Sequence, residues 1–272
     1  MADFRLDEVG SWSEIKLEIV RKYAATYSTI LTRQKNIRRH VYIDGFAGAG
    51  HHVSRTTGDV IQGSPAIALD IMPPFSEYHW IDLHSGRVAE LRRLAEGRSE
   101  VKVYDGDCNK ILLEDVFPRC RYEDFSRGLC LLDPYALNVN WKVLTTAGSM
   151  KTIEVFYNFM IMDANMNVLW TNPDRIRQVQ ADRMNLVWGD ESWRSAAYRT
   201  QKGLFDDIEE KRGNQAIVDA FRQRLKDEAG FAYVPEPVPM KNTKGAVVYY
   251  LFFASPNSTG SKIVTEIFDK YR

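Results

Sequence analysis

The stretch Val41-Tyr42-Ile43-Asp44-Gly45-Phe46-Ala47-Gly48-Ala49-Gly50 decides the fold. An apolar strand ends there on a carboxylate and breaks into a loop of small residues. Glycines at the carboxyl end of a strand let the backbone approach a ligand closely, because no Cβ intervenes. The order Asp-x-Phe-x-Gly-x-Gly differs from the dinucleotide pattern Gly-x-Gly-x-x-Gly. It predicts a strand followed by a ligand-binding turn, with a tight turn that holds no ligand as the alternative.

Length and composition indicate an ordinary globular protein. The chain has 272 residues, of which 44% are hydrophobic and 26% charged, a balance able to bury a sizeable core. This length permits one large α/β domain or two small ones. The 36 basic and 36 acidic residues cancel. A protein that grips nucleic acid by itself is usually basic, so the balance argues against a strong stand-alone nucleic-acid binder.

The cysteines and the apolar runs indicate the cellular compartment in which the protein is expected. Cys108, Cys120 and Cys130 form no Cys-x-x-Cys pair, which favours reduced thiols over a disulfide framework or a zinc site. The N-terminus carries no signal-peptide pattern, and no apolar run reaches about 18 residues. We expect a soluble, cytoplasmic protein with no membrane partner and no metal site.

The first segment predicts a long amphipathic helix. Ser11-Trp12-Ser13-Glu14 has the form of a capping box, and apolar residues recur behind it near helical period, so we expect a helix over about 12–33. A basic cluster follows, directly before the strand of the glycine loop: Arg33, Lys35, Arg38, Arg39 and His40. A solvated face is the simpler interpretation of this cluster, and contact with phosphates is the alternative.

Strands alternate with helices from residue 41 onward. Strands are predicted at 41–46, 77–83, 100–105, 128–133 and 151–159, and helices near 64–71, 85–96, 109–117 and 141–147. The alternation predicts an α/β fold with a mainly parallel sheet and helices on both faces. Right-handed crossovers then place the carboxyl ends of the strands along one edge, where ligands bind.

The last third of the chain is organised differently. Residues 160–229 are predicted to be mostly helical, with a long polar helix over about 207–229. Glu236-Pro237-Val238-Pro239 predicts an edge or bulged strand. A turn at 242–245 joins it to a second strand at 246–254, which gives an antiparallel hairpin.

The whole chain is predicted to form one domain. That hairpin completes a seven-stranded, Rossmann-like sheet whose last strand runs antiparallel, as in methyltransferases. A closing helix is expected over 262–271, and no linker divides the sequence. We therefore predict a single methyltransferase-like domain over 1–272, with an N-terminal helix and a helical insertion at about 160–229.

Four aspartates fall at the ends of consecutive predicted strands: Asp44, Asp82, Asp107 and Asp133. Any one of them alone is explained as a loop or helix-cap residue. Four along one sheet edge predict a polar binding site. Ser64 precedes a proline and is a natural helix cap, but the same helix amides are also able to bind a carboxylate.

Histidines and tryptophans invite other interpretations. His51 and His52 follow the glycine loop, but no third ligand stands at metal spacing, which favours flexible loop histidines. Trp188 and Trp193 are of the residue type that stacks on nucleic-acid bases. Packing in the core of the helical segment is the simpler prediction for both.

The glycine loop resembles the first motif of S-adenosylmethionine (SAM) dependent methyltransferases, especially those that act on amino groups of nucleic-acid bases. In that resemblance Asp82 accepts hydrogen bonds from the ribose hydroxyls, Asp107 accepts one from the adenine amine, and the methionine part lies against loop amides. The residues implied to hold SAM are Asp44, Gly45, Phe46, Ala47, Gly48, Gly50, Ser64, Asp82, Asp107, Cys108 and Asn109.

Asp133-Pro134-Tyr135 is similar to the catalytic motif of amino methyltransferases. There the acid and a following carbonyl orient the target amine toward the methyl group, and the aromatic ring stacks on an extruded base. Positioning supplies most of the rate gain, because the sulfonium already provides a good leaving group. The familiar motif has two prolines before the aromatic residue, and this chain has one.

Taken together, the motifs resemble the three-Cys-motif partner protein family. The matching stretches are Trp12, Lys16-Leu17, Tyr42 to Gly48, Gly63-Ser64-Pro65, Gly106 to Asn109, Asp133-Pro134-Tyr135, Glu154, Asn158-Phe159-Met160, Trp188-Gly189 and Tyr249 to Phe253. The family is named for a genomic neighbour, a radical-SAM-like protein with a three-cysteine motif. The chain has Tyr135 and Ala136 where the family usually has Phe-Gly, and a ribosomal-RNA adenine methyltransferase is a more distant likeness.

Three functions are compatible with these motifs to different degrees. The first is a SAM-dependent methyltransferase acting on a nucleobase amine in RNA or DNA. The second is an auxiliary subunit of the three-cysteine radical-SAM-like protein, which the missing second proline and the zero net charge favour. The third, a nicotinamide-dependent oxidoreductase, fits poorly, because Asp82 lies 34 residues past Gly48, whereas the dinucleotide fingerprint expects about 20.

Overall fold

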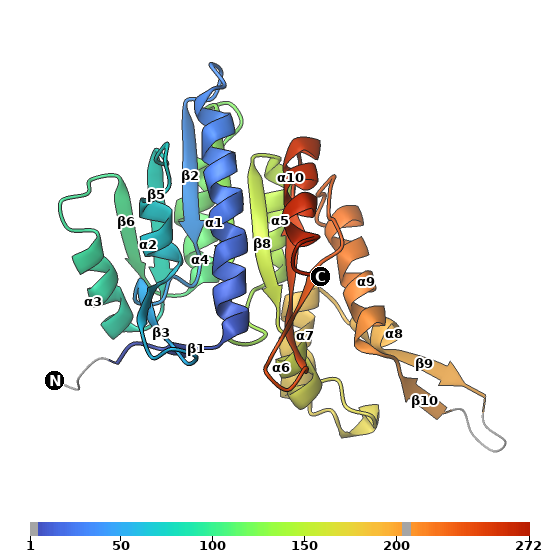
Figure 1. Ribbon diagram of the computed structural model, residues 1–272. Coiled ribbons are helices and arrows are strands. Elements are labelled where there is room, and N and C mark those ends of the chain that lie inside the picture. The colour runs from blue at the N-terminus through green and yellow to red at the C-terminus, as the bar shows by residue number, and fades with distance from the viewer. Residues whose placement is uncertain (1–4, 203–207) are drawn as a thin grey trace.

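A seven-stranded sheet forms the centre of the molecule and carries helices on both faces (Figure 1). The structure, a computed structural model, describes residues 5–202 and 208–272. The strands lie in the order β11-β12-β8-β7-β2-β5-β6. Their bounds are β2 (Arg39–Asp44), β5 (Glu77–Asp82), β6 (Val101–Asp105), β7 (Ser126–Leu132), β8 (Ile153–Phe159), β11 (Val238–Lys241) and β12 (Val247–Ala254).

Strand directions confirm the predicted fold class. β2 pairs in parallel with β5 and β7, and parallel pairing continues to β6 and β8. β12 runs antiparallel to β8, and β11 runs antiparallel to β12. This mainly parallel sheet with a reversed last strand is the Rossmann-like methyltransferase arrangement. β11 is the edge strand, and its register shifts between Met240 and Lys241, as its flanking prolines predicted.

The helices follow the predicted alternation with the sheet strands. The predicted helix at 109–117 is divided into α4, a π-helical turn η1 and a 3-10 turn η2. The bounds are α1 (Ser11–Thr32), α2 (Ser64–Leu69), α3 (Ser85–Leu94), α4 (Cys108–Ile111), η1 (Leu112–Val116), η2 (Phe117–Arg119), α5 (Trp141–Met150), α6 (Ile161–Asn167), η3 (Pro173–Arg175), α7 (Gln178–Trp188), α8 (Trp193–Ala197), α9 (Asn214–Asp227) and α10 (Ser258–Phe268).

Alternate side chains along the strands enter two separate hydrophobic cores. Along β2, Val41 and Ile43 lie in the core covered by α5, α7 and α9, whereas Tyr42 lies in the core covered by α1, α2 and α10. Trp188 and Trp193 are buried in the first of these cores, which confirms their predicted packing role. Both faces of the sheet are therefore closed to ligands.

The N-terminal helix has the predicted length, but its capping box is wrong. Gly10 precedes the helix in an extended conformation and makes no side-chain cap. Glu14 instead accepts a hydrogen bond from the Ser54 hydroxyl at 2.7 Å. A strand that the sequence did not predict brings Ser54 to Glu14, and this tertiary contact replaces the local one.

That strand belongs to a small three-stranded sheet beside the glycine loop. β3 (His51–Ser54) pairs antiparallel with β4 (Val60–Gln62), and β1 (Glu8–Val9) adds to β3 in parallel. The prediction of flexible loop histidines is therefore wrong, since His51 and His52 are strand residues. Both histidines pair with β4, His51 with Gln62 and His52 with Ile61, whereas β1 pairs with the end of β3.

The basic cluster lies at the opposite edge of the sheet from the four aspartates. It precedes and begins β2, whereas Asp44 ends that strand. His40 is buried, with Nε2 2.8 Å from the Ser28 hydroxyl oxygen, and the Arg39 guanidinium lies 3.7 Å from the Glu77 carboxylate. The cluster is therefore separated from the predicted site residues by the length of β2, and its contact with phosphates stays a prediction.

The insertion between β8 and β11 is only partly helical. It contains α6 to α9 and a hairpin of β9 (Tyr198–Gln201) and β10 (Ile208–Lys211), which extends from the body of the molecule (Figure 1). The predicted helix over 207–229 is wrong in its first part, because α9 begins only at Asn214, and residue 207 lies outside the described residues. Cross-strand pairing in the hairpin overrides the helical propensity of this charged segment.

The structure also shows the state of the cysteines and whether any helix could span a membrane. Cys108, Cys120 and Cys130 are free and buried. Within the described residues, no helix combines the length and the apolar character needed to cross a membrane.

We expect Gly148→Ala to lower the free energy of unfolding by about 1–3 kcal/mol, the usual cost of overpacking. An added Cβ at Gly148 would lie 1.9 Å from the Ala229 carbonyl oxygen, although alanine normally favours a helix interior over glycine by about 0.5–1 kcal/mol. Urea denaturation measures the difference. Gly213→Ala is the control, since a Cβ there meets no atom within 4 Å. An equally mild effect of both changes would contradict the close approach of α5 to Ala229.

Candidate functional site

A cavity of about 560 Å³ lies beside the carboxyl ends of β2, β5 and β6, within the range of about 300–1,000 Å³ typical of small-molecule sites. Its wall contains seven of the predicted residues: Gly45, Phe46, Asp82, Asp107, Cys108, Asn109 and Tyr135. The predicted residues that do not line it are Asp44, Ala47, Gly48, Gly50, Ser64, Asp133 and Pro134. The structure thus gathers half of the predicted set around one opening.

The glycine loop is held in place by hydrogen bonds of its own backbone. Gly48 and Gly50 have φ angles of +66° and +83°, a region that favours glycine. The Gly45 amide donates to the Leu131 carbonyl at 2.9 Å, and the Ala47 amide donates to the Ile81 carbonyl at 2.9 Å. These amides, which the resemblance assigned to the methionine part of SAM, already have protein partners.

Asp82 ties the glycine loop to the neighbouring strand. Its Oδ2 accepts from the Gly48 amide at 3.0 Å, and its Oδ1 accepts from the His84 amide at 2.8 Å. The side chain is buried yet lines the cavity. Because each carboxylate oxygen has two acceptor positions, Asp82 retains capacity for a ligand hydroxyl while it fixes the loop.

Asp107 and Asn109 shape the far wall of the cavity. Asp107 Oδ1 caps α4 by accepting from the Asn109 amide at 2.6 Å. The Asn109 side chain bridges a second loop, donating to the Asn138 carbonyl at 2.9 Å and accepting from the Asn140 amide at 2.7 Å. Burial raises the pKa of the Cys108 thiol to about 12, so this residue lines the wall as an unreactive thiol.

Arg87 lines the wall and Asp7 contacts Arg87, and neither residue was predicted from the sequence. Arg87 Nη2 lies 2.9 Å from Asp7 Oδ2, and the Tyr135 hydroxyl donates to the same oxygen at 3.2 Å. The Arg87 guanidinium lies 5.1 Å from the centre of the Tyr135 ring, within cation–π range. One face of the ring that the motif offered to a base is therefore covered by Arg87. No spacing in the sequence joins these three residues.

A second polar group, the Lys16 cluster, lies deeper, beneath the end of β7. It comprises Asp133 with its two partners: Lys16 on α1 forms an ion pair with Asp133 Oδ2, and the Asn158 amide donates to Asp133 Oδ1. Lys16 is buried. Both partners stood in the stretches that carried the family resemblance, but sequence analysis gave neither a role in the site.

Unpaired polar atoms surround the Lys16 cluster. In the part of the chain that the structure describes, Asp44 Oδ2, His52 Nδ1 and Asn158 Oδ1 are buried without a hydrogen-bond partner. Buried polar atoms in native proteins are nearly always satisfied. These three atoms lie at the edge of the sheet that carries the cavity, where a polar ligand or ordered water would satisfy them.

Ser64 does not take its predicted place as a helix cap. Gly63 occupies the capping position, and Ser64 is the first residue of α2. The Gly63 amide donates to the Gly50 carbonyl at 2.8 Å. A Cβ at Gly63 would lie 3.0 Å from that carbonyl oxygen, so only glycine lets α2 join the glycine loop this closely.

Burial changes the protonation of Asp44. It raises the pKa of this carboxyl to about 7, while Ser64 and the Phe46 amide act in the opposite direction. The charge of Asp133 adds to the rise, and that of Lys16 reduces it. Burial also lowers the pKa of His52, with Lys16 acting in the same sense. The groups under the loop therefore influence one another electrostatically.

Comparisons with known proteins support the fold. No protein-family model matches the chain, and no curated protein matches it significantly. A crystal structure of a Legionella pneumophila protein of the family DUF519 is 12% identical, with a TM-score of 0.52, and the match covers 94% of this chain and 92% of that one. At this identity the likeness shows the fold alone.

A weaker structural match carries a functional description. It is a Listeria monocytogenes protein provisionally described as an S-adenosylmethionine dependent methyltransferase, with 11% identity and a TM-score of 0.43, covering 86% of this chain and 99% of the other. A TM-score of this size supports no argument about the present site.

Asp44→Asn should make the unliganded protein more stable above neutral pH. The folded-state pKa is raised from 3.8 to about 7, so the folded state holds the proton more tightly, and stability falls as pH rises through this interval. The loss amounts to about 4 kcal/mol at most. Urea denaturation at about pH 5 and about pH 8 should show this fall for the wild type and a flatter profile for the variant. Asp105→Asn, at an exposed strand end, should keep the wild-type profile; a wild type whose stability does not fall would contradict the assignment.

Proposed function

We propose that this protein binds SAM in the carboxyl-edge cavity and transfers the methyl group to an exocyclic amine of a nucleobase in RNA or DNA. The observation that carries the proposal is the meeting of Asp82, Asp107 and the glycine loop around one ligand-sized cavity. In open α/β sheets, ligands bind outside the carboxyl ends of the strands. The fold and the position of the cavity agree with this rule.

The residues present fit the chemical groups of SAM. Asp82 and Asp107 offer acceptors for ribose hydroxyls and for an adenine amine, and Phe46 offers an apolar contact in the same wall. Unpaired atoms belong to Asp44 at the end of β2, to Asn158 near the end of β8 and to His52 in β3. Such atoms are suited to an ammonium or a carboxylate. Acceptors for a nucleoside and polar atoms for the ammonium and carboxylate of an amino acid are thus both present, and SAM contains both parts.

Asp133 is the side chain best placed to orient an acceptor. SAM, when bound, supplies a methyl group on a positively charged sulfur, and a displacement of this kind depends mainly on alignment of the nucleophile. Lys16 and Asn158 hold the Asp133 carboxylate in one orientation. Since each oxygen keeps a further acceptor position, Asp133 is able to receive a hydrogen bond from an amine without losing either partner.

An auxiliary role beside a three-cysteine radical-SAM-like protein is the second candidate. The observation that favours it is the internal pairing of both acceptor side chains. Asp133 is paired with Lys16, and Tyr135 contacts Asp7 and Arg87. In this candidate the fold and the SAM site serve assembly or cofactor supply, and no acceptor enters.

SAM affinity should fall about tenfold in Asp107→Asn, the loss of one hydrogen bond to a charged group. Asparagine still caps α4 through its side-chain oxygen, but the replaced oxygen no longer accepts from the adenine amine. Isothermal titration with SAM, S-adenosylhomocysteine and NAD measures this, with Asp105→Asn as the exposed control. Tight binding of NAD without binding of SAM would refute the proposed cofactor.

Transfer of labelled methyl from SAM to total RNA or DNA should fall about a hundredfold in Asp133→Asn, a loss typical of removing one positioned polar group. SAM affinity should persist, which separates acceptor positioning from cofactor binding. Because Asp133→Asn leaves Lys16 buried without its charged partner, the double variant Asp133→Asn with Lys16→Met tests the same point in a neutral setting. Absence of transfer to any substrate, with co-purification of a three-cysteine protein, would favour the auxiliary role.

A further inference from the structure

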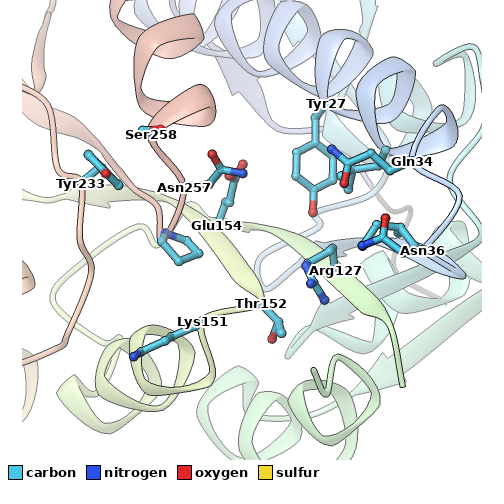
Figure 2. A pocket seen from close by; sticks show the side chains of 13 residues that line it. Tyr27, Gln34, Asn36, Arg127, Lys151, Thr152, Glu154, Tyr233, Asn257 and Ser258 are labelled. Carbon is cyan, nitrogen blue, oxygen red and sulfur yellow. The ribbon is translucent and has the colours of Figure 1, made fainter. Parts of the chain in front are cut away.

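A second cavity of about 390 Å³ opens at the opposite edge of the sheet (Figure 2). It is bounded by the end of α1 with Tyr27, the start of β7 with Arg127, the residue Thr152 before β8, and the start of α10 with Ser258. The carboxyl-edge cavity shares none of these lining residues. Nothing in the proposed methyl-transfer function makes use of this space.

Two buried hydroxyl groups in this cavity have no partner. The Tyr27 and Thr152 side chains line the cavity, with relative exposures of 7% and 1%. Their oxygens form no hydrogen bond within residues 5–202 and 208–272. Figure 2 shows the Tyr27 hydroxyl directed toward the space between Glu154 and Arg127. A buried hydroxyl left unpaired costs about 1–3 kcal/mol, so the cavity has donors prepared for a ligand.

The charges in the wall favour an anion. Arg127 and Lys151 contribute two cations, and the 11-residue helix α10 points its amino end at the cavity through Ser258, where the helix dipole favours negative charge. Lys151 follows α5 and has a left-handed φ of +56°. This conformation is uncommon for a residue other than glycine.

Glu154 is the one acidic side chain in the wall, and its surroundings weaken its charge. Burial raises its pKa to about 7, against the effect of hydrogen bonds from the Tyr23 and Ser255 hydroxyls. Near neutral pH a large part of this carboxyl is therefore protonated. The balance of charge in the cavity is positive.

The basic cluster found in the sequence surrounds the same opening. Gln34 and Asn36 line the cavity, and the alternate residues Arg33 and Lys35 are exposed beside them. Arg38, three positions after Lys35, is also exposed, and its guanidinium lies over the Phe125 ring at 5.1 Å from the ring centre. Positive charge at the rim of a cavity raises the local concentration of anions. This gives the cluster a role that the carboxyl-edge site does not supply.

We infer that the amino-edge cavity is a binding site for a small molecule that carries a phosphate group. Arg127, Lys151 and the start of α10 meet the phosphate charge. The hydroxyls of Tyr27 and Thr152 donate hydrogen bonds to its oxygens. The site is independent of the proposed methyl transfer, because the two cavities lie at opposite edges of the sheet.

The test is isothermal titration of the full chain with inorganic phosphate, ribose 5-phosphate and ribose. Saturable binding of both phosphate compounds, and none of ribose, is the expected result. Tyr27→Phe should weaken phosphate binding about tenfold, the value of one hydrogen bond to a charged group. The same change removes an unpaired buried hydroxyl, so thermal stability of the unliganded variant should be equal to or above that of the wild type.

Tyr157→Phe is the matched control, because it also removes a buried unpaired hydroxyl, in the core and away from the cavity. It should leave phosphate affinity unchanged. Lys151→Asn, which keeps a residue tolerant of positive φ, should weaken binding of both phosphate compounds. No saturable binding in the millimolar range, equal binding of ribose, or equal phosphate affinity of Tyr27→Phe and Tyr157→Phe would overturn the inference. SAM affinity, measured on the same variants, should not change.

Discussion

Burial of both faces of the seven-stranded sheet decides where this molecule is able to do chemistry, because polar groups are tolerated only near the strand ends. One buried carboxyl group lies at the carboxyl edge of the sheet, and another lies at its amino edge. Asp44 ends β2 beside the proposed SAM site, and Glu154 lies near the start of β8 beside the amino-edge cavity. Burial raises the pKa of both to about 7. Strongly perturbed acids cluster at functional sites, and an acid with a raised pKa stands at each edge.

The fold was largely predictable, because its information is local. Each parallel strand is an apolar run bounded by polar residues, as Val41 to Asp44 illustrates, and the helices between them have ordinary lengths. Parallel connection then follows from the alternation of strands and helices. The small sheet of β1, β3 and β4 was not predictable, since β1 is two residues long and pairs with a strand far along the chain. The β9–β10 hairpin was missed for a different reason, because cross-strand pairing overrides the helical propensity of its charged segment.

The residues of the site were predictable where they depend on local sequence and were not predictable where they depend on distant contacts. Asp82, Asp107 and Asp133 were found because strand ends can be read from the sequence. Lys16 was not given a role, because 117 positions separate it from Asp133 and a lysine in an amphipathic helix is normally on the solvent side. The contact of Arg87 with Asp7 depends on the path of the N-terminal segment over the cavity, which the small sheet fixes. No motif records such a path.

The Lys16 ion pair bears directly on the choice between enzyme and auxiliary subunit. Asp44 and Asp133 place two carboxyls beneath the loop, and the charge of Asp133 contributes to the raised pKa of Asp44. Lys16 supplies the compensating charge from α1, so the acid that would orient an acceptor is kept in place by a helix outside the parallel sheet. Lys16 is buried, whereas 28% of the Asp133 side chain is exposed, so the carboxylate remains open on one side. The same pair would fix the Asp133 carboxylate for an acceptor in an enzyme and would satisfy it internally in an auxiliary subunit. Methyl transfer by the Asp133→Asn variants, and not the ion pair itself, therefore distinguishes the two candidates.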